Sequence, residues 1–254
     1  MTESVLVSVD DGVMVITINR PQVRNAVNKA ISERIASSLD RLDSDSEIQV
    51  AIITGADGVF SSGMDLKAFV AGEIPVVEGR GFAGFCEKLP RKPLIAAVEG
   101  YAVGGGCEMA MCCDLIVAAD DAHFGIPEVK RGLVAGAGGL LRLPRQIPFR
   151  VAMEFALTGE YFSARRAYEL GFVNRLAEHG SALEVAKQLA AAIASNGPLA
   201  VAISKQILQG SRNWSTDEMF ARQHSYIRQI IDSEDAIEGP KAFAEKRTPV
   251  WKGK

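Results

Sequence analysis

The amino-acid sequence predicts an α/β protein whose C-terminal part is entirely helical. Strand-like and helical hydrophobic patterns alternate from Val5 to Leu176, and only helical periodicity follows from Ala182 onward. Glycine clusters at 104–106 and 136–139 stand at the starts of two predicted helices. Helices that have no sheet to lie on must bury their apolar faces elsewhere, so the C-terminal helices are expected to self-associate.

Length and composition are those of a globular chain with a sizeable core. The chain has 254 residues, 48% of them hydrophobic, which fits one large domain or one domain with a small appendage. Its formal net charge of −3 gives no sign of nucleic-acid binding. The N-terminus lacks an apolar signal core, and no apolar run reaches transmembrane length. The sequence therefore predicts a cytoplasmic protein that binds neither nucleic acid nor membrane.

The cysteine pattern argues against a disulfide framework and against a metal site. Cys107, Cys112 and Cys113 lie close together in an apolar helical pattern, and Cys86 stands apart from them. This placement suits buried free thiols. The spacing is not that of a paired zinc site, and the chain has only three histidines, so we expect no metal.

The first predicted elements are a hairpin, a helix and a buried strand. Val5–Val9 and Val13–Ile18 alternate as strands on either side of an Asp-Asp-Gly turn. A helix with apolar residues at helical spacing follows, and Asn28 is its predicted N-cap. Val50–Thr54 has the unbroken apolar character of a buried strand.

The middle of the chain is harder to interpret. A loop over 58–63 leads into a short helix that Asp65 is expected to begin. Residues 71–92 are rich in glycine and charge and show little periodicity, so no element is predicted for most of them. Leu94–Val98 is the next buried strand, and it leads into the stretch 100–128.

The stretch 100–128 combines a glycine-rich helix start with two carboxyl groups. Three glycines at 104–106 open a helical pattern that carries Glu108, and a strand-like run then leads to Glu128. Glycines let a ligand approach backbone N–H groups at the positive end of a helix. However, such triplets more often serve packing, and a glutamate in a first helical turn more often only complements the helix dipole. These residues alone leave both interpretations open.

The rest of the chain is mostly helical. The predicted elements are a glycine-rich loop over 132–139, a helix interrupted at Pro144, a helix over 151–157, a short helix that Ser163 is expected to cap and that ends at Gly171, and a short strand, Phe172–Leu176. From Ala182 the pattern is helical almost to the end, with breaks near Gly197, Gly210 and Ser233.

Five motifs follow one another in register: Asn19–Ala26, Phe60–Leu66, Gly100–Glu108, Phe124–Glu128 and Gly136–Gly139. Together they resemble the enoyl-CoA hydratase/isomerase family, the crotonase superfamily. The resemblance covers nearly the whole chain and implies a spiral of strand–strand–helix turns with two nearly perpendicular sheets. It assigns residues 1–195 to a core with the active site, and 196–254 to a helical region that forms homotrimers or hexamers.

The same resemblance implies an acyl-CoA ligand and a set of site residues. The thioester oxygen would lie between two backbone N–H groups, which by motif position are those of Ser62 and Gly105. Glu108 and Glu128 would be the catalytic carboxyls. The other positions assigned to substrate or coenzyme A binding are Arg24, Ala26, Gly63, Met64, Asp65, Leu66, Tyr101, Gly104, Gly136 and Lys246. No cofactor is expected, because coenzyme A is part of the substrate.

The presence of both glutamates favours a hydratase, which adds water reversibly and syn to a 2-enoyl-CoA thioester to give a 3-hydroxyacyl-CoA. Family members that only shift a double bond commonly keep the later glutamate, so a Δ3,Δ2-enoyl-CoA isomerase is the alternative. A non-catalytic acyl-CoA-binding protein is the alternative of another class.

The acyl group is less well defined by the sequence. The tail over 233–253 and Gly81–Gly84 resemble family members that act on carnitinyl-CoA, whose trimethylammonium group would need aromatic or acidic neighbours such as Phe82, Phe85 or Glu78. Many charged residues before Leu94 also argue for a short polar acyl group and against a long apolar channel.

Overall fold

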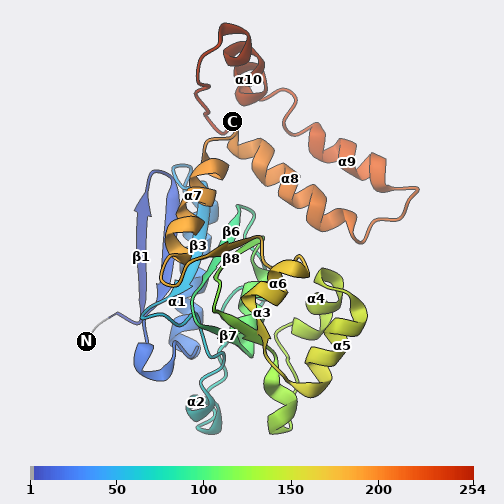
Figure 1. Ribbon diagram of the computed structural model, residues 1–254. Helices are drawn as coiled ribbons and strands as arrows, with labels where there is room; N and C mark the ends of the chain where they lie inside the picture. Colours follow the sequence, from blue (N-terminus) through green and yellow to red (C-terminus); the bar gives the residue numbers. More distant parts are fainter. Residues whose placement is uncertain (1–2) are drawn as a thin grey trace.

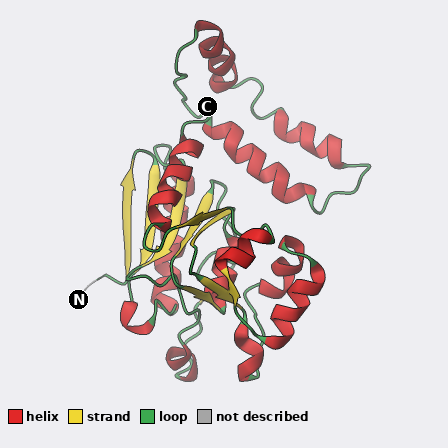
Figure 2. Cartoon of the chain, viewed as in Figure 1, coloured by secondary structure: helices red, strands yellow, loops and turns green. Residues whose placement is uncertain are grey.

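The computed structural model describes residues 3–254, which form a layered α/β core and a group of helices that extends from it (Figure 1). The largest sheet has the strand order β1-β2-β3-β6-β8-β11, and all its neighbouring strands are parallel except the β1–β2 hairpin. A smaller sheet, β10-β9-β7, runs across one end of it (Figure 2), and β4 pairs with β5.

The strands are β1 Val5–Asp10, β2 Val13–Ile18, β3 Val50–Gly55, β4 Val76–Val77, β5 Gly81–Phe82, β6 Leu94–Val98, β7 Tyr101–Val103, β8 Leu115–Ala119, β9 His123–Gly125, β10 Phe162–Ser163 and β11 Arg175–Ala177. The α-helices are α1 Lys29–Ser44, α2 Leu66–Val70, α3 Gly105–Cys112, α4 Gly139–Gln146, α5 Phe149–Thr158, α6 Ala164–Glu169, α7 Ala182–Ala194, α8 Pro198–Ser211, α9 Met219–Ile227 and α10 Glu234–Glu245. Two 3-10 helices are η1 Pro21–Val23 and η2 Pro127–Arg131.

Successive turns of the chain build the two larger sheets as a spiral. Each of β2, β3, β6 and β8 lies in the large sheet, and the segment after it moves into the second layer. In this layer, isolated parallel β-bridges join Val27 to Met64 and Ser61 to Ala102. These bridges extend the parallel pairing of β7 with β9 towards the N-terminal segments. The predicted spiral of strand–strand–helix turns is confirmed.

The large sheet is covered on both faces, as parallel sheets require. Successive residues of β3 point to opposite sides, so Ala51 and Ile53 join one buried cluster while Val50 and Ile52 join another. The second cluster is closed by buried alanines of α7. The first contains α1, α3 and the second sheet, so the candidate site is built on this side.

Several local predictions are confirmed by cap geometry. The Asn28 side chain accepts a hydrogen bond from the Ile31 N–H, and Ser163 accepts one from the Arg166 N–H. Asp65 likewise caps the short helix α2 through the N–H groups of its first turn.

Two predictions near the middle of the chain are wrong. Phe172 is not in a strand, because its N–H bonds back to Ala167 in a turn, and β11 begins only at Arg175. Pro144 does not interrupt its helix. It lies within the last turn of α4, which still ends with a bond from the Ile147 N–H to the Leu143 carbonyl.

Helices α8, α9 and α10 extend away from the sheets (Figure 1). The predicted division between residues 195 and 196 falls in the link between α7 and α8. One anchor to the core is Lys205 of α8, whose ammonium lies 2.6 Å from Asp114 and 2.8 Å from the Lys92 carbonyl. Among residues 3–254, no helix combines the length and apolar character that crossing a bilayer requires.

Candidate active site

The parallel pairing of β7 and β9 brings Glu108 and Glu128 together. Val103 at the end of β7 lies opposite Gly125 at the end of β9. Because the two strands are parallel, the segments that leave them start from the same edge of the sheet, where ligands bind in α/β folds. One segment becomes α3 with Glu108 in its first turn, and the other becomes η2 with Glu128.

Glu108 is buried and held by a loop from further along the chain. Its side chain is 3% exposed, and its Oε1 accepts hydrogen bonds of 2.8 Å from the N–H groups of both Ala137 and Gly139. A Cβ at Gly139 would lie only 3.0 Å from this oxygen, so glycine permits the close approach. The motif Gly136–Gly139 therefore acts as a cradle for Glu108.

Burial dominates the ionisation of both carboxyls. Burial raises the pKa of Glu108 most, and the charge of Glu128 also raises it, while the two N–H donors and the Arg142 cation lower it; together these effects place the pKa at about 7. Burial also raises the pKa of Glu128, whose Oε2 is buried and has no hydrogen-bond partner among the described residues. One carboxyl of the pair therefore favours its protonated form near neutral pH.

Glycines allow the Phe60–Leu66 motif to lie directly against the start of α3. A Cβ at Gly63 would lie 2.7 Å from the Gly105 nitrogen, and one at Gly106 would lie 2.3 Å from the Ser61 carbonyl oxygen. Neither contact tolerates a side chain without movement of the backbone. The two predicted oxyanion segments are thus in contact.

Ser62 is not the donor that motif position suggested. Its N–H already donates to the Arg24 carbonyl at 2.9 Å, on the side away from α3. The neighbouring Met64 N–H has no partner among residues 3–254, and neither has the N–H of Gly105. Bonds of the flanking Gly63 and Asp65 peptides to Val27 turn the Met64 N–H to the opposite side.

The Ser61 hydroxyl holds the loop that carries Gly63 and Met64. It is buried, donates to the Asn25 carbonyl at 2.8 Å and accepts from the Gly63 N–H at 3.1 Å. This bond holds the Gly63 peptide, which has a left-handed φ of 84°. The bond lies directly before Met64, so it helps to fix the direction of the free N–H.

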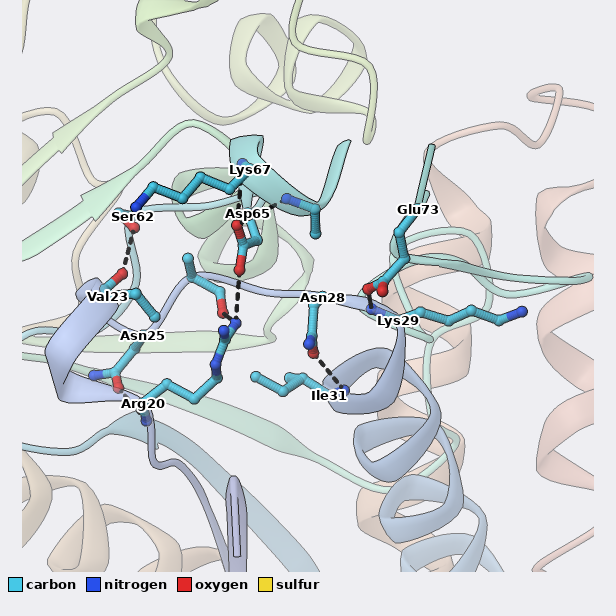
Figure 3. Close-up of polar contacts among 12 residues, drawn as sticks. Arg20, Val23, Asn25, Asn28, Lys29, Ile31, Ser62, Asp65, Lys67 and Glu73 are labelled. Carbon is cyan, nitrogen blue, oxygen red and sulfur yellow. Dashed lines mark hydrogen bonds and ion pairs between the residues drawn. The ribbon is translucent and has the colours of Figure 1, made fainter. Parts of the chain in front are cut away.

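A polar network joins the motifs Asn19–Ala26 and Phe60–Leu66, which hold six of the positions assigned to substrate or coenzyme A binding (Figure 3). The Arg20 guanidinium donates to the Ala26 carbonyl at 2.8 Å and to the Asp65 carboxylate at 3.0 Å. The buried Asn25 side chain accepts from the Arg20 N–H and donates to the carbonyls of Ala56 and Val59. Arg20 and Asn25 belong to the first motif, but no local pattern predicts that their side chains hold these two motifs together.

The structure gathers most of the other predicted site residues around this loop. Arg24 and Ala26 lie within or next to it, and Leu66 begins α2 directly behind Asp65. Tyr101 is 45% exposed at the start of β7, where it stacks on His123.

Gly136 and Lys246 differ in their relation to the site. Gly136 is exposed at the start of the loop that holds Glu108. Lys246 follows α10, at the far end of the C-terminal helices from α3 (Figure 1). The chain does not bring Lys246 to its own Glu108.

The raised pKa of Glu108 predicts how stability depends on pH. Between its unfolded value of 4.5 and its folded value of about 7, the folded protein binds the extra proton, so stability is highest below this window and falls as pH rises through it. This contribution is at most about 3 kcal/mol. When the free energy of unfolding in urea is measured at pH 5 and at pH 8, the decrease between the two pH values should therefore be smaller in Glu108→Gln than in wild type. Glu33→Gln, at an exposed position on α1, is the control; equal losses in both variants would contradict the prediction.

Comparison with known proteins agrees with this geometry. Residues 8–254 match the enoyl-CoA hydratase/isomerase family. The carnitinyl-CoA dehydratase of Escherichia coli O157:H7 is 41% identical over 266 residues, covering 100% of both chains. The crystal structure of an enoyl-CoA hydratase from Mycobacterium marinum superposes with a TM-score of 0.97 at 59% identity over 99% of each chain. A carnitinyl-CoA hydratase from Mycobacterium avium gives a TM-score of 0.80 at 42% identity over 100% of each chain. This chain belongs to the enoyl-CoA hydratase/isomerase family, the crotonase superfamily.

Proposed function

We propose that the protein is a 2-enoyl-CoA hydratase, a hydro-lyase that adds water reversibly across the double bond of an enoyl thioester. The observation that carries this proposal is the meeting of the buried Glu108 and the half-buried Glu128 beside two backbone N–H groups that have no partner among residues 3–254. The solved structures named enoyl-CoA hydratase at 58% and 59% identity support it.

The N–H groups of Met64 and Gly105 form the proposed oxyanion hole. Addition of water to C3 moves negative charge onto the thioester oxygen, and fixed donors stabilise this charge more than they stabilise the ground state. Loss of one such donor costs roughly 3–4 kcal/mol in enzymes that use them. The α3 N-terminus adds its positive dipole end at Gly105.

The two carboxyls divide the proton transfers between them. Burial raises the pKa of Glu108 to about 7, but two N–H donors stabilise its ionised form, so above this pH Glu108 is the proposed base that takes a proton from the attacking water. The unpartnered buried oxygen of Glu128 favours a protonated group, which would deliver a proton to C2. The reaction needs no metal and no cofactor beyond the coenzyme A of the substrate.

Dehydration of carnitinyl-CoA is the second candidate, because curated relatives at 40% and 41% identity carry that name. The structure reduces the number of residues that could contact its trimethylammonium group. Phe85 is fully buried and Glu78 is exposed, which leaves Phe82 as the aromatic side chain next to Gly105.

Three of the charged residues before Leu94 bond to α1, which weakens the sequence argument for a polar acyl site. Glu73 accepts from the Lys29 N–H at 2.8 Å, and Arg80 pairs with Asp40 of α1. The Arg91 N–H bonds to Asp43, near the end of the same helix. These charges therefore hold the segment against α1, and the polarity of the acyl site does not follow from them.

Replacing either carboxyl should remove most of the hydratase activity. Glu108→Gln and Glu128→Gln should each lower kcat on crotonyl-CoA by at least about 10²-fold, because each removes one acid–base step. Binding of the thioester should change little. The loss of conjugated-thioester absorbance measures the rate, with Glu160→Gln as an exposed control. Selective loss of double-bond shifting, with hydration intact, would instead indicate an isomerase, and wild type that binds but turns over no acyl-CoA would indicate a binding protein.

A substrate panel should separate the two candidate substrates. We expect short acyl groups to be preferred, because the buried Phe82 ring lies against Gly105 and limits the space beside the thioester. Crotonyl-CoA and crotonobetainyl-CoA should have higher kcat/KM than enoyl-CoAs of ten or more carbons, although one methylene changes binding by only about 1–3 kcal/mol. A steady rise of kcat/KM with chain length would contradict this expectation.

We also propose that the C-terminal helices assemble the protein into a homotrimer or hexamer. Leu208, Phe220 and Phe243 are 70%, 65% and 86% exposed in the single chain, which is costly for an isolated protein. Light scattering at micromolar concentration should give a mass of three or six chains. A monomer would refute the proposal, and Phe220→Asp should shift the distribution towards smaller species.

A further inference from the structure

Arg142 of α4 occupies an unusual place beside the Glu108 cradle. Its half-buried guanidinium donates from Nη1 to the Ala137 carbonyl at 3.1 Å, and from Nη2 to the Cys86 carbonyl. Neither partner is a carboxylate, so this arginine is not held by an ordinary ion pair. Its two bonds connect segments that lie 51 residues apart, 86 and 137.

The first partner of Arg142 is part of the loop that holds Glu108. Ala137 accepts the arginine bond at its carbonyl, while its own N–H donates to Glu108 Oε1 at 2.8 Å. The next residue, Gly138, has a φ of 98°, and a Cβ there would lie 2.0 Å from Arg142 Nη1. The guanidinium therefore fills the inner side of the turn that directs two N–H groups at Glu108.

The second partner belongs to the turn that carries Phe82. The Cys86 N–H bonds to the Phe82 carbonyl at 3.2 Å, and the Phe82 ring lies on Gly105, the proposed oxyanion donor. Arg142 thus connects the loop that holds the catalytic carboxyl with the turn that packs on the oxyanion segment.

We propose that Arg142 is a positioning residue for hydration: it fixes the 137–139 loop against the 82–86 turn, so that two N–H groups converge on the Glu108 carboxylate. This inference rests on the proposed hydratase function. Arg142 does not itself touch the reacting atoms, and it acts through Glu108 by geometry and by charge.

The positive charge of Arg142 should change the ionisation of Glu108 in a known direction. The groups that face Glu108 are Glu128 from η2, Arg142 from α4 and the buried thiols of Cys86 and Cys107. Glu128 and burial disfavour the Glu108 carboxylate, whereas the Arg142 cation favours it. Removing that cation should therefore raise the pKa of Glu108 and shift the acidic limb of the kcat profile to higher pH.

Three variants on α4 test the proposal. Arg142→Gln removes both the charge and the fork of donors, and Arg142→Lys keeps the charge but loses the two-carbonyl geometry. Arg145→Gln is the control, because Arg145 is exposed on the same helix. Measurements on crotonyl-CoA are kcat, KM, the pH dependence of kcat and the melting temperature.

In Arg142→Gln, kcat should fall about 10²-fold, the scale of a misplaced catalytic group, while KM changes little. Its acidic limb should move to higher pH. In Arg142→Lys, kcat should be intermediate and the limb should stay near that of wild type. Arg145→Gln should match wild type in every readout.

The outcomes separate the inference from the function on which it rests. A wild type that hydrates no enoyl-CoA refutes both. If wild type is active, the inference alone is refuted when Arg142→Gln lowers the melting temperature but leaves kcat and the acidic limb of the pH profile unchanged. Should Arg142→Gln fail to fold, Arg142→Lys decides: full kcat in that variant would exclude a positioning role.

Discussion

The close contact between two backbone segments is the constraint on which the candidate site depends. The loop that ends at Gly63 lies against the start of α3 so closely that side chains at Gly63 or Gly106 would overlap with the opposite backbone. This contact places the free Met64 and Gly105 N–H groups on neighbouring segments. An oxyanion hole made of main-chain donors is rigid because the fold itself fixes the donors, and rigidity is what makes preorganised donors effective.

The site also has an energetic cost that the surrounding loops offset. Two carboxyls lie partly or fully out of water, and burial raises the pKa of each. The protein compensates Glu108 with two backbone N–H donors and a nearby cation, but leaves one oxygen of Glu128 without a partner. This asymmetry is how a fold can make two chemically identical groups behave as a base and an acid.

Side chains that bond to the main chain hold the scaffold around the site. Asn25 and Ser61 brace the first two motifs, and Arg142 joins two later segments through their carbonyls. Such bonds satisfy buried backbone groups that no sheet or helix can reach. Irregular loops can therefore hold a defined geometry at the edge of a regular sheet.

The sequence by itself determined the parts of this protein that local patterns encode. Alternating apolar residues identified the hairpin, and unbroken apolar runs identified the buried strands. Asn28, Asp65 and Ser163 marked helix starts, because capping depends on residues only two or three positions away. The motifs also identified Glu108 and Glu128, because both the residue type and its place after a strand are visible in the chain.

Only the tertiary structure decided which groups are free to act. The Ser62 N–H is used by Arg24, 38 positions earlier, so the available donor is that of Met64. Glu73, Arg80 and Arg91 bond to α1, and Lys246 directly follows α10, which lies away from α3 (Figure 1). The partner of a backbone group or of a long charged side chain comes from distant segments. The spacing of residues in the sequence does not predict that partner, because only the packed fold determines which distant segments come into contact.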